Sequence, residues 1–104
     1  MNSFKELELT LDGYFHSLGD LPAMIRPNGT KFWYQHGEIH RDYDDLPAVI
    51  YANGSKYWYQ HGDLHRLTGP AVEFSDGEVR YWIEGEELSK EQFKERIRCL
   101  KSTK

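Results

Sequence analysis

Hydrophobic and polar positions alternate in short runs through the middle of the chain. The runs AVIY (48–51) and KYWYQ (56–60) enclose the pair Asn53-Gly54. An Asn-Gly pair between β-branched and aromatic residues predicts a β-hairpin, because both central residues of the tight turn accept positive φ. A His-Gly pair at 61–62 marks a second reversal, and a brief run of alternating polarity follows it. The pattern therefore predicts short antiparallel strands joined by local connections.

This pattern recurs along the chain. Three segments of similar sequence follow one another at offsets of 25 and 23 residues: 21–41, 46–66 and 69–89. Residues 12–17 (DGYFHS) resemble the closing half of one further unit. A repeat built from hairpins predicts a mainly β fold, namely an antiparallel β-meander of three repeated units over residues 12–88. We expect roughly six to eight short strands.

The period of the apolar residues changes after residue 88. Ser89 and Gln92 have the spacing of a capping box, which marks the start of a helix. One helical face is apolar and carries Phe93, Ile97 and Leu100. We expect a helix from about residue 90 to residue 100 that caps the array, within a C-terminal region spanning 89–104. All 104 residues are expected to form one domain.

Alternation with a period of two sorts the strand residues into two faces. Trp33 and Trp58 belong to one register, and Tyr34 and Tyr59 to the other. We expect the tryptophans to pack inward, because a tyrosine hydroxyl favours a half-exposed position. The aliphatic residues expected to be buried with the tryptophans are Met24, Val49 and Val72.

The strands at the two edges of the predicted meander could pair with another chain. Leu7, Leu9 and Leu11 alternate strictly with polar residues and predict an N-terminal strand. An open meander has two edge strands with unpaired backbone groups, which can pair with another chain. We therefore expect a homodimer that forms through an edge strand or through the aromatic face.

The charge of the chain is unevenly distributed. Residues 1–88 hold 7 basic and 15 acidic side chains, whereas residues 89–104 hold 6 basic and 2 acidic ones. The acidic body argues against direct binding of nucleic acid or of a membrane surface. No apolar run approaches the ~20 residues of a membrane span, and the N-terminus does not have the pattern of a signal peptide. Together with the lone Cys99, these features predict a cytoplasmic protein.

Two pairs of histidines, each four residues apart, suggest three interpretations. A zinc site would use His36 and His40, or His61 and His65, but the glycine within each pair lies in a predicted turn rather than on a helix. A catalytic pair would join His40 or His65 to a nearby aspartate, but no serine or cysteine nucleophile lies in a Gly-flanked elbow. The third unit has Glu84 and Leu88 at the histidine positions. We therefore expect no metal, no cofactor and no enzymatic activity.

The remaining interpretation is a turn with its anchoring residues. A residue that recurs in successive units serves the geometry of the unit, whereas catalysis needs one unique constellation. On this interpretation Arg41 and Arg66 pair with acids of the connection that follows each of them. The acids available for such pairs are Asp42, Asp44, Asp45 and Asp63.

The repeated pattern is also characteristic in its order. Gly-x-x-His-Arg is followed by Pro-Ala, then by Asn-Gly or Asp-Gly, and then by Trp-Tyr or Tyr-Trp. This order, over about residues 12–89, resembles a repeat of small phage, viral and bacterial proteins that is similar to the MORN family of β-hairpin modules. The resemblance implies an open β-meander with a binding role and no catalytic residues.

Two functions follow as expectations. The first is a non-enzymatic protein-binding module whose contacts come from the tyrosine-rich face, because tyrosine offers a large contact area at low entropic cost. Its contact residues would be Tyr34, Tyr51, Tyr57 and Tyr59. The alternative is a phage-encoded acidic inhibitor of a host defence or nucleic-acid-handling protein, acting in the host cytoplasm. Its contact residues would be Asp42, Asp44, Asp45, Asp63, Glu86 and Glu87.

Overall fold

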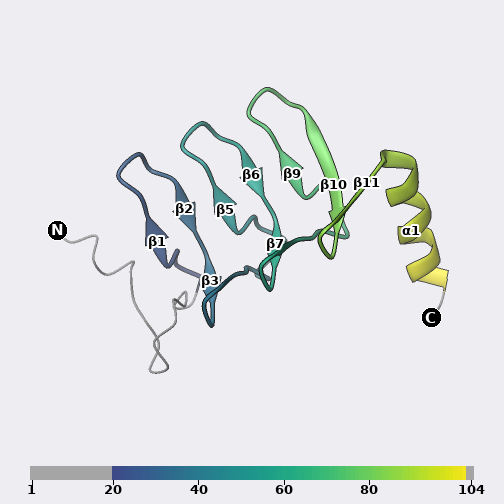
Figure 1. The fold of residues 1–104 in the computed structure, drawn as a ribbon, viewed down its shortest axis with the longest axis horizontal. Coiled ribbons are helices and arrows are strands. Elements are labelled where there is room, and N and C mark those ends of the chain that lie inside the picture. Colours follow the sequence, from purple (N-terminus) through teal and green to yellow (C-terminus); the bar gives the residue numbers. More distant parts are fainter. Residues whose placement is uncertain (1–19, 103–104) are drawn as a thin grey trace.

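The computed structural model describes residues 20–102, which form short strands followed by a C-terminal helix (Figure 1). The first unit contains β1 (Met24–Ile25), β2 (Lys31–Phe32), β3 (Tyr34–Gln35) and β4 (Glu38–Ile39). The second contains β5 (Val49–Ile50), β6 (Lys56–Tyr57), β7 (Tyr59–Gln60) and β8 (Asp63–Leu64). The third contains β9 (Val72–Glu73), β10 (Val79–Ile83) and β11 (Glu86–Leu88), and α1 (Lys90–Ser102) follows. The N-terminal strand and the half-unit expected over residues 7–17 lie outside the described residues.

The strands form one antiparallel sheet with two small hairpins beside it. Seven strands pair in the order β1-β2-β5-β6-β9-β10-β11, while β3-β4 and β7-β8 pair separately. The mainly β meander with a C-terminal helix is therefore confirmed, and residues 20–102 contain more strands than the six to eight expected. The excess arises because each unit folds as two hairpins, and because pairing is interrupted at Trp33 and Trp58, where β2 gives way to β3 and β6 to β7.

The two hairpins of each unit use different turns. In the second hairpin both central residues have positive φ, as at His61 (52°) and Gly62 (86°). In the first hairpin only the glycine does, as at Gly54 (98°), and Asn53 Oδ1 instead accepts a hydrogen bond from Ser55 N (2.9 Å). The expectation of positive φ at both positions of the Asn-Gly turn was therefore wrong. Asn-Gly here forms the longer hairpin loop that ends in a left-handed glycine, and His-Gly forms the tight two-residue turn.

Both faces of the sheet contribute buried residues. Trp33 (4% exposed) and Trp58 (7%) are buried, as the alternation predicts. Val49 (1%) and Val72 (3%) are also buried, but on the opposite face from the tryptophans. A single row of cross-strand partners runs over that other face and contains Met24, Phe32, Val49, Tyr57, Val72 and Arg80. The expected grouping of Met24 and the valines with the tryptophans was therefore wrong, because the pairing places Val49 between Phe32 and Tyr57, Val72 beyond Tyr57, and Met24 beside Phe32.

Side chains at both turns connect each unit to the next. Thr30 Oγ1 accepts a hydrogen bond from Ala52 N (3.1 Å), and Ser55 Oγ accepts one from Ser75 N (3.0 Å). Thr30 and Ser55 are buried, so these contacts satisfy polar groups that water does not reach.

The second histidine of each motif makes the equivalent contact at the other turn. His61 N–H donates to His40 Nδ1 (3.0 Å), and Glu84 N–H donates to His65 Nδ1 (2.9 Å). Because Nδ1 accepts, Nε2 carries the proton and donates to Asp42 in the case of His40 (3.3 Å). Each histidine therefore holds the turn of the following unit. The third unit has Leu88 at this position, and the helix follows it instead of a further unit.

Helix α1 begins as the sequence predicts and ends two residues later, at Ser102. Ser89 N–H donates to Gln92 Oε1 (2.8 Å) and Gln92 N–H donates to Ser89 Oγ (3.1 Å), which confirms the capping box. Phe93 is buried against Ile83 and Leu88, with Tyr81 and Ile97 beside them. Leu100, the third residue of the expected apolar face, is 46% exposed.

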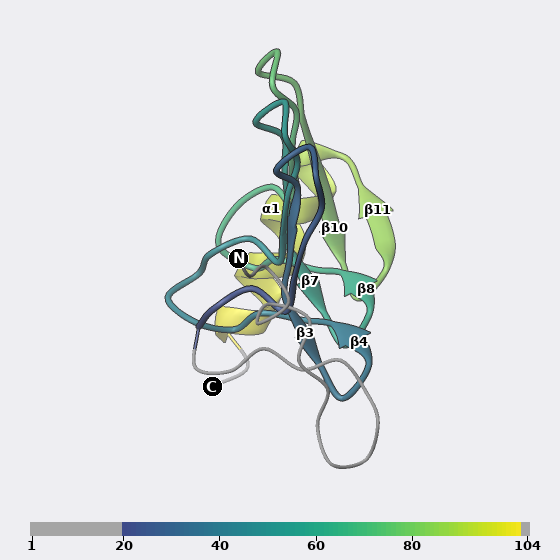
Figure 2. The ribbon, with the colours of Figure 1, turned by 90° about the vertical axis from the view of Figure 1, so that its left-hand side faces the viewer.

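The sheet has two distinct sides when viewed along its length (Figure 2). The connections between units and α1 lie on one side, which we call the connection side. The second hairpins, with β4, β8 and β11, turn toward the other side (Figure 2). The tryptophans belong to the connection side, because Trp58 Nε1 donates to the backbone oxygen of Asp45 in the connection (2.9 Å).

The histidine contacts lead to a prediction about stability. His40→Phe keeps the size of the ring but removes the acceptor for His61 N–H, which lies beside a side chain that is only 3% exposed. We expect the substitution to lower the free energy of unfolding by about 1 kcal/mol, at the low end of the cost of an unsatisfied donor, because the His61 N–H is only partly buried. His65→Phe is the matched control, because water can replace the lost acceptor at the exposed Glu84 N–H. Urea denaturation of both variants measures this, and equal losses would contradict the role assigned to His40.

Candidate functional site

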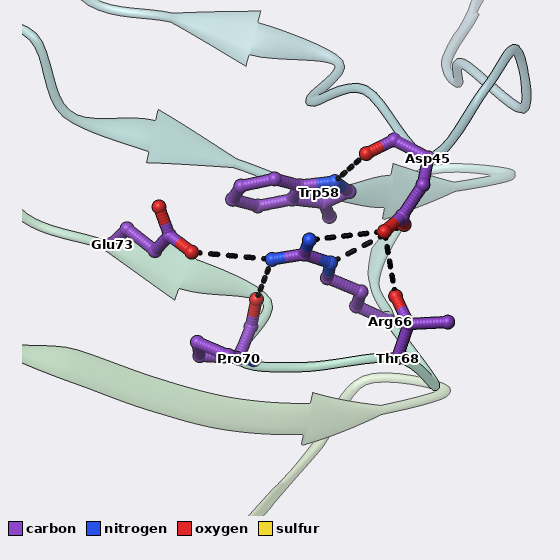
Figure 3. A network of polar contacts seen from close by, with 6 residues as sticks. All are labelled: Asp45, Trp58, Arg66, Thr68, Pro70 and Glu73. Carbon is purple, nitrogen blue, oxygen red and sulfur yellow. Dashed lines mark hydrogen bonds and ion pairs between the residues drawn. The ribbon is translucent and has the colours of Figure 1, made fainter.

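An aromatic, cationic and acidic residue meet on the connection side of each of the first two units. In the second unit the Arg66 guanidinium lies 3.7 Å from the ring centroid of Trp58 (Figure 3). Arg66 Nε and Nη2 donate to the Asp45 carboxylate (3.3 and 3.0 Å), and Thr68 Oγ1 donates to it as well (2.7 Å). Arg66 Nη1 donates to Pro70 O (3.0 Å) and to Glu73 (3.2 Å). We call this arrangement the Trp-Arg-Asp clamp.

The first unit contains the same clamp. The Arg41 guanidinium lies 3.8 Å from the ring centroid of Trp33, and it donates to both Asp20 carboxylate oxygens (2.9 and 2.7 Å). Arg41 Nη1 donates to Pro47 O (2.9 Å), so the arginine also contacts the beginning of the next unit. Each arginine therefore joins the first residue before its own unit, its own tryptophan and the proline of the following unit.

The clamp corrects the expected pairing of the arginines. Each arginine bonds to the aspartate that precedes its own unit, not to an acid of the connection that follows. The reason is that the connection folds back over the tryptophan, which places Asp45 beside Arg66. A recurring signal for this exists in the sequence, because Asp-Leu-Pro-Ala occurs at 20–23 and again at 45–48. Asp20 was missed as a partner because it lies outside the motif that contains the histidines.

The clamp also determines the protonation of its acid. The hydrogen bond from Arg66 holds the pKa of Asp45 below its usual range, although burial acts in the opposite direction. Asp45 has a φ of 58°, a left-handed conformation that aspartate tolerates better than most residues. Asp45 is thus committed to the fold rather than available to a partner.

The opposite side of the sheet carries a cluster of aromatic side chains. The Tyr57 ring centroid lies 5.0 Å from that of Tyr51, 6.5 Å from that of Tyr59 and 6.2 Å from that of Phe74. In the first unit, Phe32 lies 6.4 Å from Tyr34 between ring centroids. We call these six residues the aromatic row: Phe32, Tyr34, Tyr51, Tyr57, Tyr59 and Phe74.

The aromatic row is half-exposed. Tyr51 is 36% exposed, and the other five residues are partly buried. Helix α1 leaves this row uncovered, because its Phe93 packs on Tyr81. Tyr81 lies between Arg80 and Trp82 in the sequence, so alternation along β10 directs its side chain to the connection side. In residues 20–102 the row therefore faces the side toward which the second hairpins turn.

Phe74 was not among the expected contact residues. It follows Val72 by two positions, just as Tyr51 follows Val49, so alternation places both on one face. Arg26 occupies the equivalent position in the first unit and its guanidinium lies 5.3 Å from the ring centroid of Phe32. Comparing all three units, rather than only the first two, would have identified both residues.

Two tyrosine hydroxyls of the row have altered acidity. Burial raises the pKa of Tyr51 and that of Tyr59, and neighbouring tyrosines add to the effect. Both hydroxyls therefore stay protonated at neutral pH and remain hydrogen-bond donors.

The expected acidic contacts do not form one group. Asp42 has a 66% exposed side chain and contacts His40, whereas Asp45 is held in the clamp. Asp44 is exposed on the same connection and Asp63 is exposed on β8. The structure thus brings Tyr51, Tyr57 and Tyr59 together but divides the four aspartates between different roles. Glu86 and Glu87 lie on β11, where they face Arg96 and Arg80.

Within 20–102, no three His, Cys, Asp or Glu side chains gather as a metal site would require. In the same part of the chain no helix has the length and apolar character needed to cross a membrane. Comparison of the sequence with protein-family models, and of the chain with curated proteins and solved structures, finds no match.

The lowered pKa of Asp45 predicts a pH-dependent stability. A carboxyl whose folded pKa is depressed contributes stability above its ordinary pKa of ~3.9, and the contribution is lost as pH falls through the folded value. Asp45→Asn should therefore melt below the native protein at pH 7, and the difference should shrink as the pH falls below about 4. Thermal melts across this range measure it, with exposed Asp44→Asn as the control. A difference that stays constant down to pH 2 would contradict the clamp.

The two sides of the sheet should respond differently to truncation. Trp58→Ala removes a ring that is only 7% exposed, and should cost about 3–5 kcal/mol of unfolding free energy. Tyr59→Ala removes a half-exposed ring of the aromatic row, and should cost about 1 kcal/mol. Chemical denaturation of both variants tests this. If Tyr59→Ala is the more damaging substitution, the row is core and not a surface.

Proposed function

We propose that the protein is a non-enzymatic protein-binding module and that the aromatic row is its contact surface. The observation that carries this proposal is the row itself, in which six aromatic side chains from three units lie half-exposed on one side of the sheet. Tyrosine and phenylalanine provide large contact areas, and tyrosine is enriched among the residues that dominate binding energy at protein interfaces.

The rest of the fold supports this use of the row. The clamps and α1 occupy the connection side, so neither of them covers the residues proposed to bind. Four residues of the row lie on paired strands, and Tyr51 and Phe74 directly follow β5 and β9, which limits the entropy lost when a partner binds. The histidines are engaged in holding turns, and this argues for a structural role in place of a catalytic one.

The acidic inhibitor expected from the charge distribution is the second candidate. Asp42, Asp44 and Asp63 are exposed and could contact a basic partner, whereas Asp45 is already paired with Arg66. Binding through such charges would weaken steeply with salt, because exposed charges are screened over about 10 Å at 0.1 M ionic strength. Binding through the aromatic row would depend much less on salt.

Affinity capture with matched variants tests the proposed function. The native protein is immobilised on a support and incubated with a lysate of its source organism. It should retain a partner that the double variant Tyr57→Ala/Tyr59→Ala does not retain. Lys56→Ala is the control, because Lys56 is exposed and points to the opposite face from its neighbour Tyr57. Each variant is first shown by its melting curve to be folded.

Three results would overturn the use of the aromatic row. Capture that survives the double tyrosine variant excludes the row as the contact. Loss of capture with Asp42→Asn/Asp44→Asn/Asp63→Asn, together with strong salt dependence, would favour the acidic inhibitor. A dimer mass in light scattering that the tyrosine variants reduce to a monomer would assign the row to self-association instead.

A further inference from the structure

We infer that the aromatic row recognises a proline-rich segment in the polyproline II conformation, lying across the strands. This inference rests on the proposed function and specifies the class of partner. It begins from the row of cross-strand partners that joins Phe32 on β2, Tyr57 on β6 and Arg80 on β10. Val49 and Val72 lie between them in the same register, so large side chains recur at every second strand.

The spacing of these side chains matches one kind of peptide. Two steps between paired strands amount to about 9.4–9.8 Å. A polyproline II helix advances about 9.3 Å per turn of three residues, so every third residue would meet the next large side chain. The 5.4 Å pitch of an α-helix and the ~6.7 Å two-residue repeat of a β-strand do not match this distance.

The chemistry of the row fits the same ligand. Proline rings pack on aromatic faces, and the rings of Tyr57 and Tyr59 are nearly parallel, with an interplanar angle of 13°. A polyproline II helix makes no internal hydrogen bonds, so its carbonyl groups need donors. The hydroxyls of Tyr51 and Tyr59 stay protonated at neutral pH and can donate to these carbonyls. Aromatic-lined surfaces are the general means by which such helices are recognised.

The charges at the two ends of the row indicate the flanking residues of the peptide. Arg26 lies over Phe32 at the end formed by the first unit. At the end formed by the third unit, Glu78 and Glu87 surround Arg80 and leave one net negative charge. A complementary peptide therefore has an acidic residue at the first end and a basic residue at the other. The register of cross-strand partners from Phe32 to Arg80 spans four strand steps, about 19 Å, which corresponds to about six residues of polyproline II between these flanks.

The experiment uses the full chain and synthetic peptides of about nine residues, a length set by the span of the row. One peptide consists of prolines with aspartate at one end and arginine at the other. The control peptide has the same charged ends but glycine and serine in place of proline. Tyrosine fluorescence titrations measure both affinities. We expect the proline peptide to bind at least about tenfold more tightly, because its conformation is already ordered.

Variants show whether the row itself makes the contact. Tyr57→Ala should weaken binding of the proline peptide by about tenfold or more, whereas Lys56→Ala should leave it unchanged. Equal affinity for the two peptides, or an unchanged affinity in Tyr57→Ala, overturns the inference. If neither peptide binds but a captured protein still requires Tyr57 and Tyr59, then the row binds a partner of another conformation. In that case the polyproline inference fails while the proposed function stands.

Discussion

The rest of this structure depends on an arginine that stacks on a tryptophan ring and at the same time donates two hydrogen bonds to an aspartate. A chain of two-residue strands cannot bury a large continuous core, and each face of a single sheet is open to water. The clamp solves this locally, because the guanidinium covers the tryptophan ring while its Nε, Nη1 and Nη2 donate to Asp45, Pro70 and Glu73. An Arg-to-carboxylate fork is also more geometrically specific than a single ion pair. The clamps thus cover the tryptophans on the connection side, and the aromatic row lies on the other.

Much of the fold could be predicted because the sequence repeats. The alternation of apolar residues, the turn pairs and the capping box at Ser89 each have a local physical cause. In residues 20–102 the first two mark strands and hairpins as predicted, although Asn-Gly has positive φ only at its glycine, and the capping box is confirmed. The prediction failed where the geometry depends on contacts between units. Alternation places Val49 opposite its neighbour Ala48, but whether Val49 shares a face with Phe32 depends on the pairing of β2 with β5. That register is fixed by the connection and is not a property of either strand alone.

Among the expected contact residues, the tyrosines could be predicted from local features and the aspartate contacts could not. The tyrosines could be predicted because they share a period and a face, and the structure brings three of them into one cluster. The aspartates were chosen for their charge alone, and charge does not reveal which carboxylate is already bound. Asp45 looks like its neighbour Asp44 in the sequence, yet only Asp45 lies within reach of an arginine 21 residues later. Long-range pairing of this kind requires the three-dimensional structure.

The replacement of His-Arg by Leu88-Ser89 has a consequence for how the chain can change in length. Leu88 is buried beneath Phe93, and Ser89 starts the helix, so this dipeptide ends the array where His-Arg would continue it. The middle unit, by contrast, offers Ser55, His65 and Arg66 to the third unit. It meets the equivalent groups of the first unit through Ala52 N, His61 N and Pro47 O. A duplicated copy of this unit would therefore find the partners that it needs on both sides and leave the terminal dipeptide undisturbed. Tandem duplication within the gene could therefore lengthen the sheet in whole units, each carrying its own tyrosines. Leu88-Ser89 would still end the array.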